Sequence, residues 1–294
     1  KIEINNRTPV KPADVTDTPA SGPGSATDDE SSAGRSTPAD DTVPNGGHVD
    51  LHVKVLTDRV VDRAKARGLD ALVYAPHFTR LPEIRARAEQ FSDEDLLVVP
   101  GREVFTGTWR NRRHVLAVGL SEPVPDFISL PGALDAFERQ GAAVLVPHPG
   151  FLNVSLGTED LRAHADRIHA VETHNLKLFP HQNRRARRLA READRPGFGS
   201  SYAHLAGSVG EVWTAFDRRI DSEADLVAAL REGAPRRILR RNGPQHTARR
   251  LAEFAHLGYE NSWSKIDRLF LSGMEPTHPD HVAYRGRFDD VRTY

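Results

Sequence analysis

The sequence predicts a distorted (β/α)7-type, TIM-like barrel of parallel strands, and two observations support this fold class. From residue 48 onward, short apolar and β-branched runs alternate with amphipathic helical stretches. Histidine or glutamate side chains lie in or just past several of these runs. Barrels of this kind place their sites at the carboxyl ends of the strands. We therefore expect a closed sheet with ligand-type residues gathered at one end.

Each element follows from a local pattern. Strands are expected where β-branched runs lie between turn residues, and helices where apolar residues recur at helical spacing. The helix at 57–68 ends on a glycine, and the helix at 222–233 begins with a serine followed by an acid three residues later. The expected strands are 49–55, 71–75, 96–100, 114–120, 142–149, 170–175 and 198–204. The expected helices are 57–68, 81–91, 132–141, 158–168, 180–194 and 222–233.

The composition divides the chain into three regions. Residues 1–47 are rich in Ser, Thr, Asp, Pro and Gly and almost free of large apolar side chains. Such a segment cannot bury enough surface to offset its conformational entropy, so we expect a disordered tail. Residues 48–234 form the expected barrel domain. Residues 235–294 include an amphipathic stretch at 247–260 and are expected to form a helical extension that packs on the barrel.

Composition also excludes several classes of protein. The 294 residues include no cysteine, which excludes disulfides and thiolate metal sites and leaves only nitrogen and oxygen ligands. The formal net charge of −1 argues against electrostatic capture of nucleic acid by the chain as a whole. No apolar run is long enough to cross a bilayer and no basic-then-apolar leader is evident, so we expect a cytoplasmic protein without a membrane partner. The sequence does not indicate an oligomeric state.

The ligand-type residues occur in short motifs with a definite order. Taken in this order, from about His48 to Phe216, the motifs resemble those of the PHP (polymerase and histidinol phosphatase) superfamily of metal-dependent phosphoesterases. No single motif is specific enough to indicate this, but the series is. The motifs are Asp50-Leu51-His52-Val53-Lys54, Ala75-Pro76-His77, Gly101-Arg102-Glu103, His114, His148-Pro149, Glu172-Thr173-His174-Asn175 and Gly199 to His204.

The resemblance implies three metal positions, of which this chain keeps the ligands only in part. One position would use Glu103, His114 and His148, which are all present. In the second, Lys54 and Tyr202 stand where the family has a histidine and an aspartate. The third lacks an early-loop histidine. We therefore expect one or two divalent ions (zinc, manganese or iron) rather than three. The implied metal ligands are Glu103, His114, His148, His52, His77 and His204.

Lys54 is the most informative departure from the family pattern. It lies two residues after His52, so on a strand both side chains face the same way. An ammonium has no lone pair for a metal, but it can supply positive charge near Glu103 and a phosphate. We therefore expect a catalytic role for Lys54 in place of a metal. The other candidate catalytic residues, as proton donors or phosphate contacts, are His52, His77 and His204.

Arginines provide candidate phosphate contacts, because a guanidinium binds phosphate through two parallel hydrogen bonds. The arginine-rich runs at 184–191 and 236–250 are weaker evidence for a nucleic-acid surface, because no aromatic side chains are interleaved with them. The candidates in loops expected to face the site are Arg80, Arg102, Arg110, Arg112 and Arg113.

These expectations combine into one function and two alternatives. The primary hypothesis is a hydrolase that cleaves a small phosphate ester with metal-activated water and a reduced number of metals. The first alternative is a catalytically degenerate regulatory module that still binds metal or phosphate. The second is a nuclease that acts on nucleic-acid ends.

Overall fold

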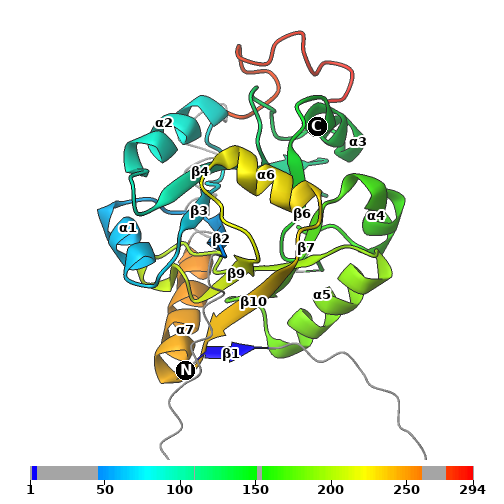
Figure 1. Ribbon diagram of the computed structural model, residues 1–294. Helices are drawn as coiled ribbons and strands as arrows, with labels where there is room; N and C mark the ends of the chain where they lie inside the picture. The colour runs from blue at the N-terminus through cyan, green and yellow to red at the C-terminus, as the bar shows by residue number, and fades with distance from the viewer. Residues whose placement is uncertain (1, 5–45, 109, 151–153, 260–275, 294) are drawn as a thin grey trace, which may run out of the picture.

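The structure is a computed structural model, and it describes residues 2–4, 46–108, 110–150, 154–259 and 276–293. Helices surround a central set of strands (Figure 1). The strands are β1 (Ile2–Ile4), β2 (His48–Val53), β3 (Ala71–Tyr74), β4 (Leu97–Thr106), β5 (Arg113–Val118), β6 (Ala143–Val146), β7 (Ala170–Asn175), β8 (Gly197–Ser200), β9 (Val212–Phe216) and β10 (Arg236–Arg241). The helices are α1 (Asp58–Lys65), α2 (Leu81–Phe91), α3 (Leu130–Arg139), α4 (Thr158–Ala163), α5 (Pro180–Glu192), α6 (Glu223–Arg231) and α7 (Pro244–Tyr259).

The strands form a nearly closed barrel, which confirms the predicted fold class. Within the described residues they make one sheet in the order β1-β10-β9-β2-β3-β4-β5-β6-β7-β8. The end of β8 returns to β2 through a parallel bridge between Val53 and Ala203. The pairings make β2, β3, β4, β6, β7, β8 and β10 point the same way, while β1, β5 and β9 run against them.

Strand β5 departs from the expectation of an all-parallel barrel, and its connection explains why. Only residues 107–112 separate β4 from β5. A parallel neighbour would need a crossover of a dozen or more residues, so this link permits only an antiparallel pair. The reversal matters for the site, because it brings the start of β5, rather than its end, to the carboxyl end of β4.

The ends of the chain differ from the sequence expectation. Strands β9 and β10 were not expected, and β10 lies in the segment assigned to a helical extension. Its sequence RRILRR shows a single fully buried position, Leu239, so its pattern resembles a solvated charge run rather than a strand. Ile2–Ile4 pair antiparallel with β10. Residues 5–45 lie outside the described residues, and the disordered tail stays a prediction there.

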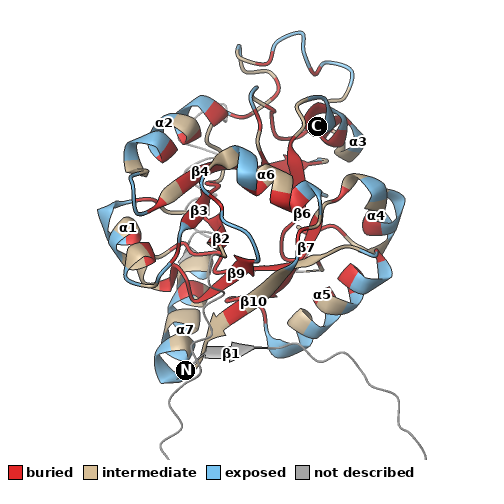
Figure 2. Ribbon diagram, in the orientation of Figure 1, coloured by how far each residue is buried: buried red, intermediate tan, exposed pale blue. Residues whose placement is uncertain are grey.

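The apolar core leaves one end of the barrel for chemistry. Figure 2 shows burial concentrated in the strands and exposure on the outer helix faces. Inward strand residues such as Val49, Val99 and Leu145 pack with Leu226 and Leu230 of α6. Helix α6 therefore closes the interior at the amino ends of the strands, and the opposite mouth is lined by polar side chains. None of the described helices is both long and apolar enough to span a lipid bilayer.

Candidate metal centre

The barrel mouth brings Glu103, His114 and His148 together. Their candidate ligand atoms all lie within 4.8 Å of one another, and all three residues are buried. Glu103 is on β4, and the β4–β5 register places His114 diagonally across from it, two residues along. His148 follows β6. The sequence had placed these residues on separate strands, and the fold gathers them around one point.

The geometry of these three residues fits a divalent ion. The Oε1 atom of Glu103 lies 3.1 Å from Nδ1 of His114 and 3.2 Å from Nε2 of His148. Ligands at about 2.0–2.1 Å from a tetrahedral ion are separated by about 3.3 Å. One carboxylate and two imidazoles are also the donors that zinc, manganese or iron accept. The three side chains therefore form a site suited to a divalent metal, without indicating which one.

The second carboxylate oxygen of Glu103 faces a different set of groups. The Lys54 ammonium forms an ion pair with Oε2 and donates to the carbonyl of Ala75 at 2.6 Å. The Nδ1 atom of His77 lies 3.1 Å from Oε2, and Nε2 of His52 lies 3.6 Å from it. Glu103 thus directs one oxygen to the candidate metal ligands and the other to an ammonium.

The electrostatics keep Glu103 charged and the imidazoles of His52, His77 and His114 neutral. Burial alone would raise the pKa of Glu103, but the Lys54 ammonium and the neighbouring histidines hold it well below its ordinary value. Burial lowers the pKa of His52 to about 3 and that of His114 to about 4, and Lys54 adds to both effects. Burial and Lys54 also hold the pKa of His77 well below its usual range. Neutral imidazoles have the free lone pair that a metal requires.

Further buried groups orient His148 and the loops of the site. The Nδ1 atom of His148 lies 3.0 Å from the Ser155 hydroxyl, which fixes the imidazole ring. The His148 backbone N–H donates to Glu172 at 2.6 Å. On the other side of the barrel, Asp50 accepts backbone N–H bonds from Ser201 and Gly210, both at 2.9 Å. Burial raises the pKa of Asp50 to about 6.

A second buried lysine, absent from the sequence-based candidates, lies at the same mouth. The Lys177 ammonium contacts Nδ1 of His204 and is 3.1 Å from Oε2 of Glu253, which is contributed by α7. It also lies 4.1 Å from the centre of the Tyr202 ring, while Lys54 lies 5.6 Å from that centre. In the sequence, Lys177 is marked only by its position two residues after a strand. The arginine-rich helix that follows makes one more cation there inconspicuous.

Backbone strain is concentrated at this mouth. His148, Tyr202 and Phe78, which follows His77, adopt positive φ values of 33°, 48° and 52°. Non-glycine residues rarely adopt this conformation, and such strain persists where the surroundings enforce it, commonly at functional sites. The unusual geometry of His148 therefore supports a functional site on grounds independent of residue type.

Three of the arginines proposed as phosphate contacts, Arg80, Arg102 and Arg113, are paired with acidic side chains. Arg102 is corrected most clearly: it is buried and paired with Asp126 at 2.8 Å, because successive side chains of a strand face opposite ways and Glu103 faces inward. Arg80 pairs with Glu83, and Arg113 lies 3.3 Å from Asp160. Arg110 is exposed, and Arg112 lies 5.9 Å from the Phe105 ring centre. Lys54 and Lys177 carry the positive charge of the mouth instead.

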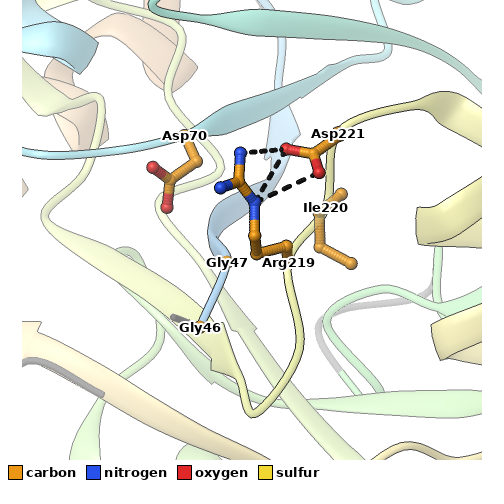
Figure 3. Close-up of a pocket in the computed structure, with 6 residues that line it drawn as sticks. All are labelled: Gly46, Gly47, Asp70, Arg219, Ile220 and Asp221. Carbon is orange, nitrogen blue, oxygen red and sulfur yellow. Dashed lines mark hydrogen bonds and ion pairs between the residues drawn. The ribbon is translucent and has the colours of Figure 1, made fainter. Parts of the chain in front are cut away.

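A separate hollow lies at the amino ends of the strands and carries no comparable chemistry. Gly46, Gly47, Asp70, Arg219, Ile220 and Asp221 line it (Figure 3). Arg219 and Asp221 are paired with each other there at 2.9 Å and are largely exposed. In barrels of this type the amino end is associated with stability rather than with catalysis. We assign no site to this hollow.

Comparison with known proteins supports the family resemblance. Residues 180–235 match the family model described as PHP-associated. This segment runs from the start of α5 to the residue before β10. The match covers 56 of the 294 residues, and it agrees with the resemblance that the order of the motifs indicates. The comparison with curated proteins finds no match.

Solved structures share the fold at low sequence identity. PsfC from Pseudomonas syringae is 19% identical with a TM-score of 0.56, over 74% of this chain and 99% of PsfC. The lesion-specific endonuclease PfuEndoQ from Pyrococcus furiosus is 14% identical with a TM-score of 0.50, over 66% of this chain and 57% of that one. A two-domain protein from Bacteroides vulgatus, containing a predicted PHP-like metal-dependent phosphoesterase, is 18% identical with a TM-score of 0.47, over 64% and 63% respectively. At these identities the likeness to PsfC and PfuEndoQ establishes the fold alone.

Proposed function

We propose that this chain is a metal-dependent hydrolase of phosphate esters that uses one divalent ion, with the Lys54 ammonium in place of a second. The different surroundings of the two Glu103 carboxylate oxygens carry this proposal. Its Oε1 atom faces the imidazoles of His114 and His148, and its Oε2 atom is paired with Lys54. A divalent ion held by Glu103, His114 and His148 would polarise a phosphoryl oxygen and acidify a water.

The protein's own groups would perform the remaining work. Lys54 and Lys177 lie on the same mouth, close to the Tyr202 ring, and place positive charge where a phosphoryl group would bind. His77 lies between the two lysine environments, with its ring centre 6.0 Å from those of His114 and His204. A neutral imidazole there would bind a substrate oxygen or carry a proton to or from the leaving group. The substrate would be a small phosphorylated molecule in the cytoplasm.

The decisive experiment measures metal content and turnover together. Protein purified without chelator would be compared with His148→Ala and with His181→Ala, which removes an exposed histidine from α5. We expect about one metal per chain, with loss of both metal and turnover of p-nitrophenyl phosphate only in His148→Ala. Metal without turnover on mono- or diesters would instead favour the binding-module alternative. Turnover confined to a phosphodiester or oligonucleotide would favour the nuclease, and absence of metal from both proteins would contradict the proposal.

A further inference from the structure

The two arginine-rich runs of the sequence meet around one cavity that the metal centre does not use. The cavity measures about 230 Å³, and it is lined by parts of β7, α5, β9, β10 and α7. Arg184 and Arg187 come from the first run, and Arg240 and Arg250 from the second. None of the lining residues within the described chain is acidic. Four guanidinium groups therefore converge on one hollow without a carboxylate in its wall.

A buried histidine adds a directional group. His174 lines the cavity, and only 6% of its surface is exposed. Its Nε2 atom lies 3.0 Å from Nη1 of Arg187. A guanidinium only donates, so Nε2 is the acceptor and the neutral ring carries its proton on Nδ1. That Nδ1 is buried and has no hydrogen-bond partner among the described residues. This unpaired donor belongs to a residue of the cavity wall, and a buried donor without a partner costs free energy.

The surrounding charge shows that the site suits an anion. Burial and the neighbouring guanidinium groups of Arg191, Arg184 and Arg240 lower the pKa of Arg187. Burial, then Arg187 and Arg240, lower the pKa of His174 to about 4. Burial is the largest cause of both shifts, and the positive charge of the neighbouring arginines adds to it. Planar guanidinium groups match the oxygens of a phosphoryl group. One water needs roughly 10–15 Å³ of such a cavity, so a cavity of about 230 Å³ has room for a phosphoryl group.

We propose that this cavity binds the phosphoryl dianion of a free phosphate or a small phosphorylated ligand, at a site distinct from the metal centre. None of Glu103, His114 and His148 lines it. The two sites are joined through Asn175, which lines the cavity and donates to Glu172 at 3.0 Å, the carboxylate that also holds the His148 backbone N–H. An anion in the cavity would therefore lie beside the support of the metal ligands. The binding itself does not depend on the proposed hydrolysis.

The test is calorimetric titration of the full chain with inorganic phosphate and, separately, with methylphosphonate, which has no hydrolysable ester. The variants are Arg184→Gln, Arg187→Gln and His148→Ala, and Arg188→Gln is the matched control on an exposed position of the same helix. We expect a phosphate site whose binding is at least tenfold weaker in Arg184→Gln and Arg187→Gln and unchanged in Arg188→Gln and His148→Ala. Binding of methylphosphonate would indicate an organic phosphoryl ligand, and its failure beside phosphate would indicate the free anion.

Several results would overturn the proposal. Binding that is lost in His148→Ala but kept in both arginine variants would place the anion at the metal centre. Absence of binding at millimolar phosphate, or equal losses in Arg188→Gln and Arg184→Gln, would show that the cavity is not a specific site. Arg187 is hydrogen-bonded to the buried His174, so Arg187→Gln risks a folding defect. Arg184 is exposed and has no such role, which lets Arg184→Gln decide the question.

Discussion

The two oxygens of the Glu103 carboxylate define two regions with opposite chemistry. On the Oε1 side, the imidazoles of His114 and His148 lie 3.1 and 3.2 Å away, and this arrangement suits a divalent cation. The Oε2 side already holds the Lys54 ammonium, with His77 and His52 nearby. A buried carboxylate is costly unless nearby positive charge or hydrogen bonds compensate it. The comparison teaches that this barrel surrounds one carboxylate with candidate metal ligands on one side and with a lysine on the other.

Removal of the shared carboxylate should have the largest effect, because it disrupts both sides at once. We expect Glu103→Gln to reduce metal content to below about one tenth of an ion per chain, since the amide lacks the anionic ligand. It also leaves Lys54 without its buried counter-charge, which costs about 3–5 kcal/mol. Elemental analysis and urea unfolding measure the two effects, with the exposed Glu83→Gln as control. Retention of one ion per chain would contradict the assignment of Glu103.

Glu211 is a buried carboxylate held by two arginines and a histidine, and it sharpens the comparison. It contacts Arg67 and Arg249 and lies 2.7 Å from Nδ1 of His246. Burial would raise the pKa of Glu211, but these hydrogen bonds and charges lower it from 4.5 to about 2. Its stabilisation is therefore present above about pH 4.5 and lost as the pH falls towards 2.

This pKa shift predicts how a neutral variant behaves with pH. We expect Glu211→Gln to cost on the order of 3 kcal/mol at pH 7, at about 1.36 kcal/mol per pKa unit, and progressively less below pH 4.5. Urea unfolding of both proteins between pH 2.5 and 7 measures the difference. Metal content should stay unchanged, unlike in Glu103→Gln. A stability difference that does not vary with pH would show that Glu211 acts through packing instead.

Replacement of the ammonium tests the Oε2 side alone. We expect Lys54→Met to keep about one metal per chain and to lower turnover about 10- to 100-fold, because a positive charge near the phosphoryl group is lost. Metal analysis and steady-state kinetics measure the two quantities in one preparation. Lys54→His provides the counter-test: if it raised both metal content and activity, the ammonium would be no substitute for a second ion.

The smallest expected effect concerns the hydroxyl that orients His148. Ser155→Ala removes the 3.0 Å contact with Nδ1 while leaving all three candidate ligands in place. Loss of such an orienting partner commonly weakens metal affinity 10- to 100-fold, and we expect about tenfold here. Competition with a chelator measures the affinity, and Ser121→Ala, at an exposed position, is the control. Equal affinities in the two variants would remove the orienting role.

Local patterns in the sequence account for much of the fold. Short β-branched runs and helical spacing predicted the strand–helix alternation, and the motif order predicted the barrel that the structure confirms. They failed at β10, where RRILRR pairs with β9 and β1. In β10 only the side chain of Leu239 is fully buried. Such a strand has too little alternation of apolar and polar residues to be distinguished from a charged loop.

The sequence by itself determined the donor set: no cysteine, neutral-capable histidines and Glu103 on or beside successive strands. Only the tertiary structure decided how they meet, because the short β4–β5 link reverses β5 and brings His114 beside Glu103. It also decided which cations serve the site. Strand alternation turns Arg102 towards Asp126, while Lys177 and Glu253, 76 positions apart in the chain, pair at the barrel mouth. Contacts of that range leave no periodic signal in a sequence, because packing rather than local geometry specifies them.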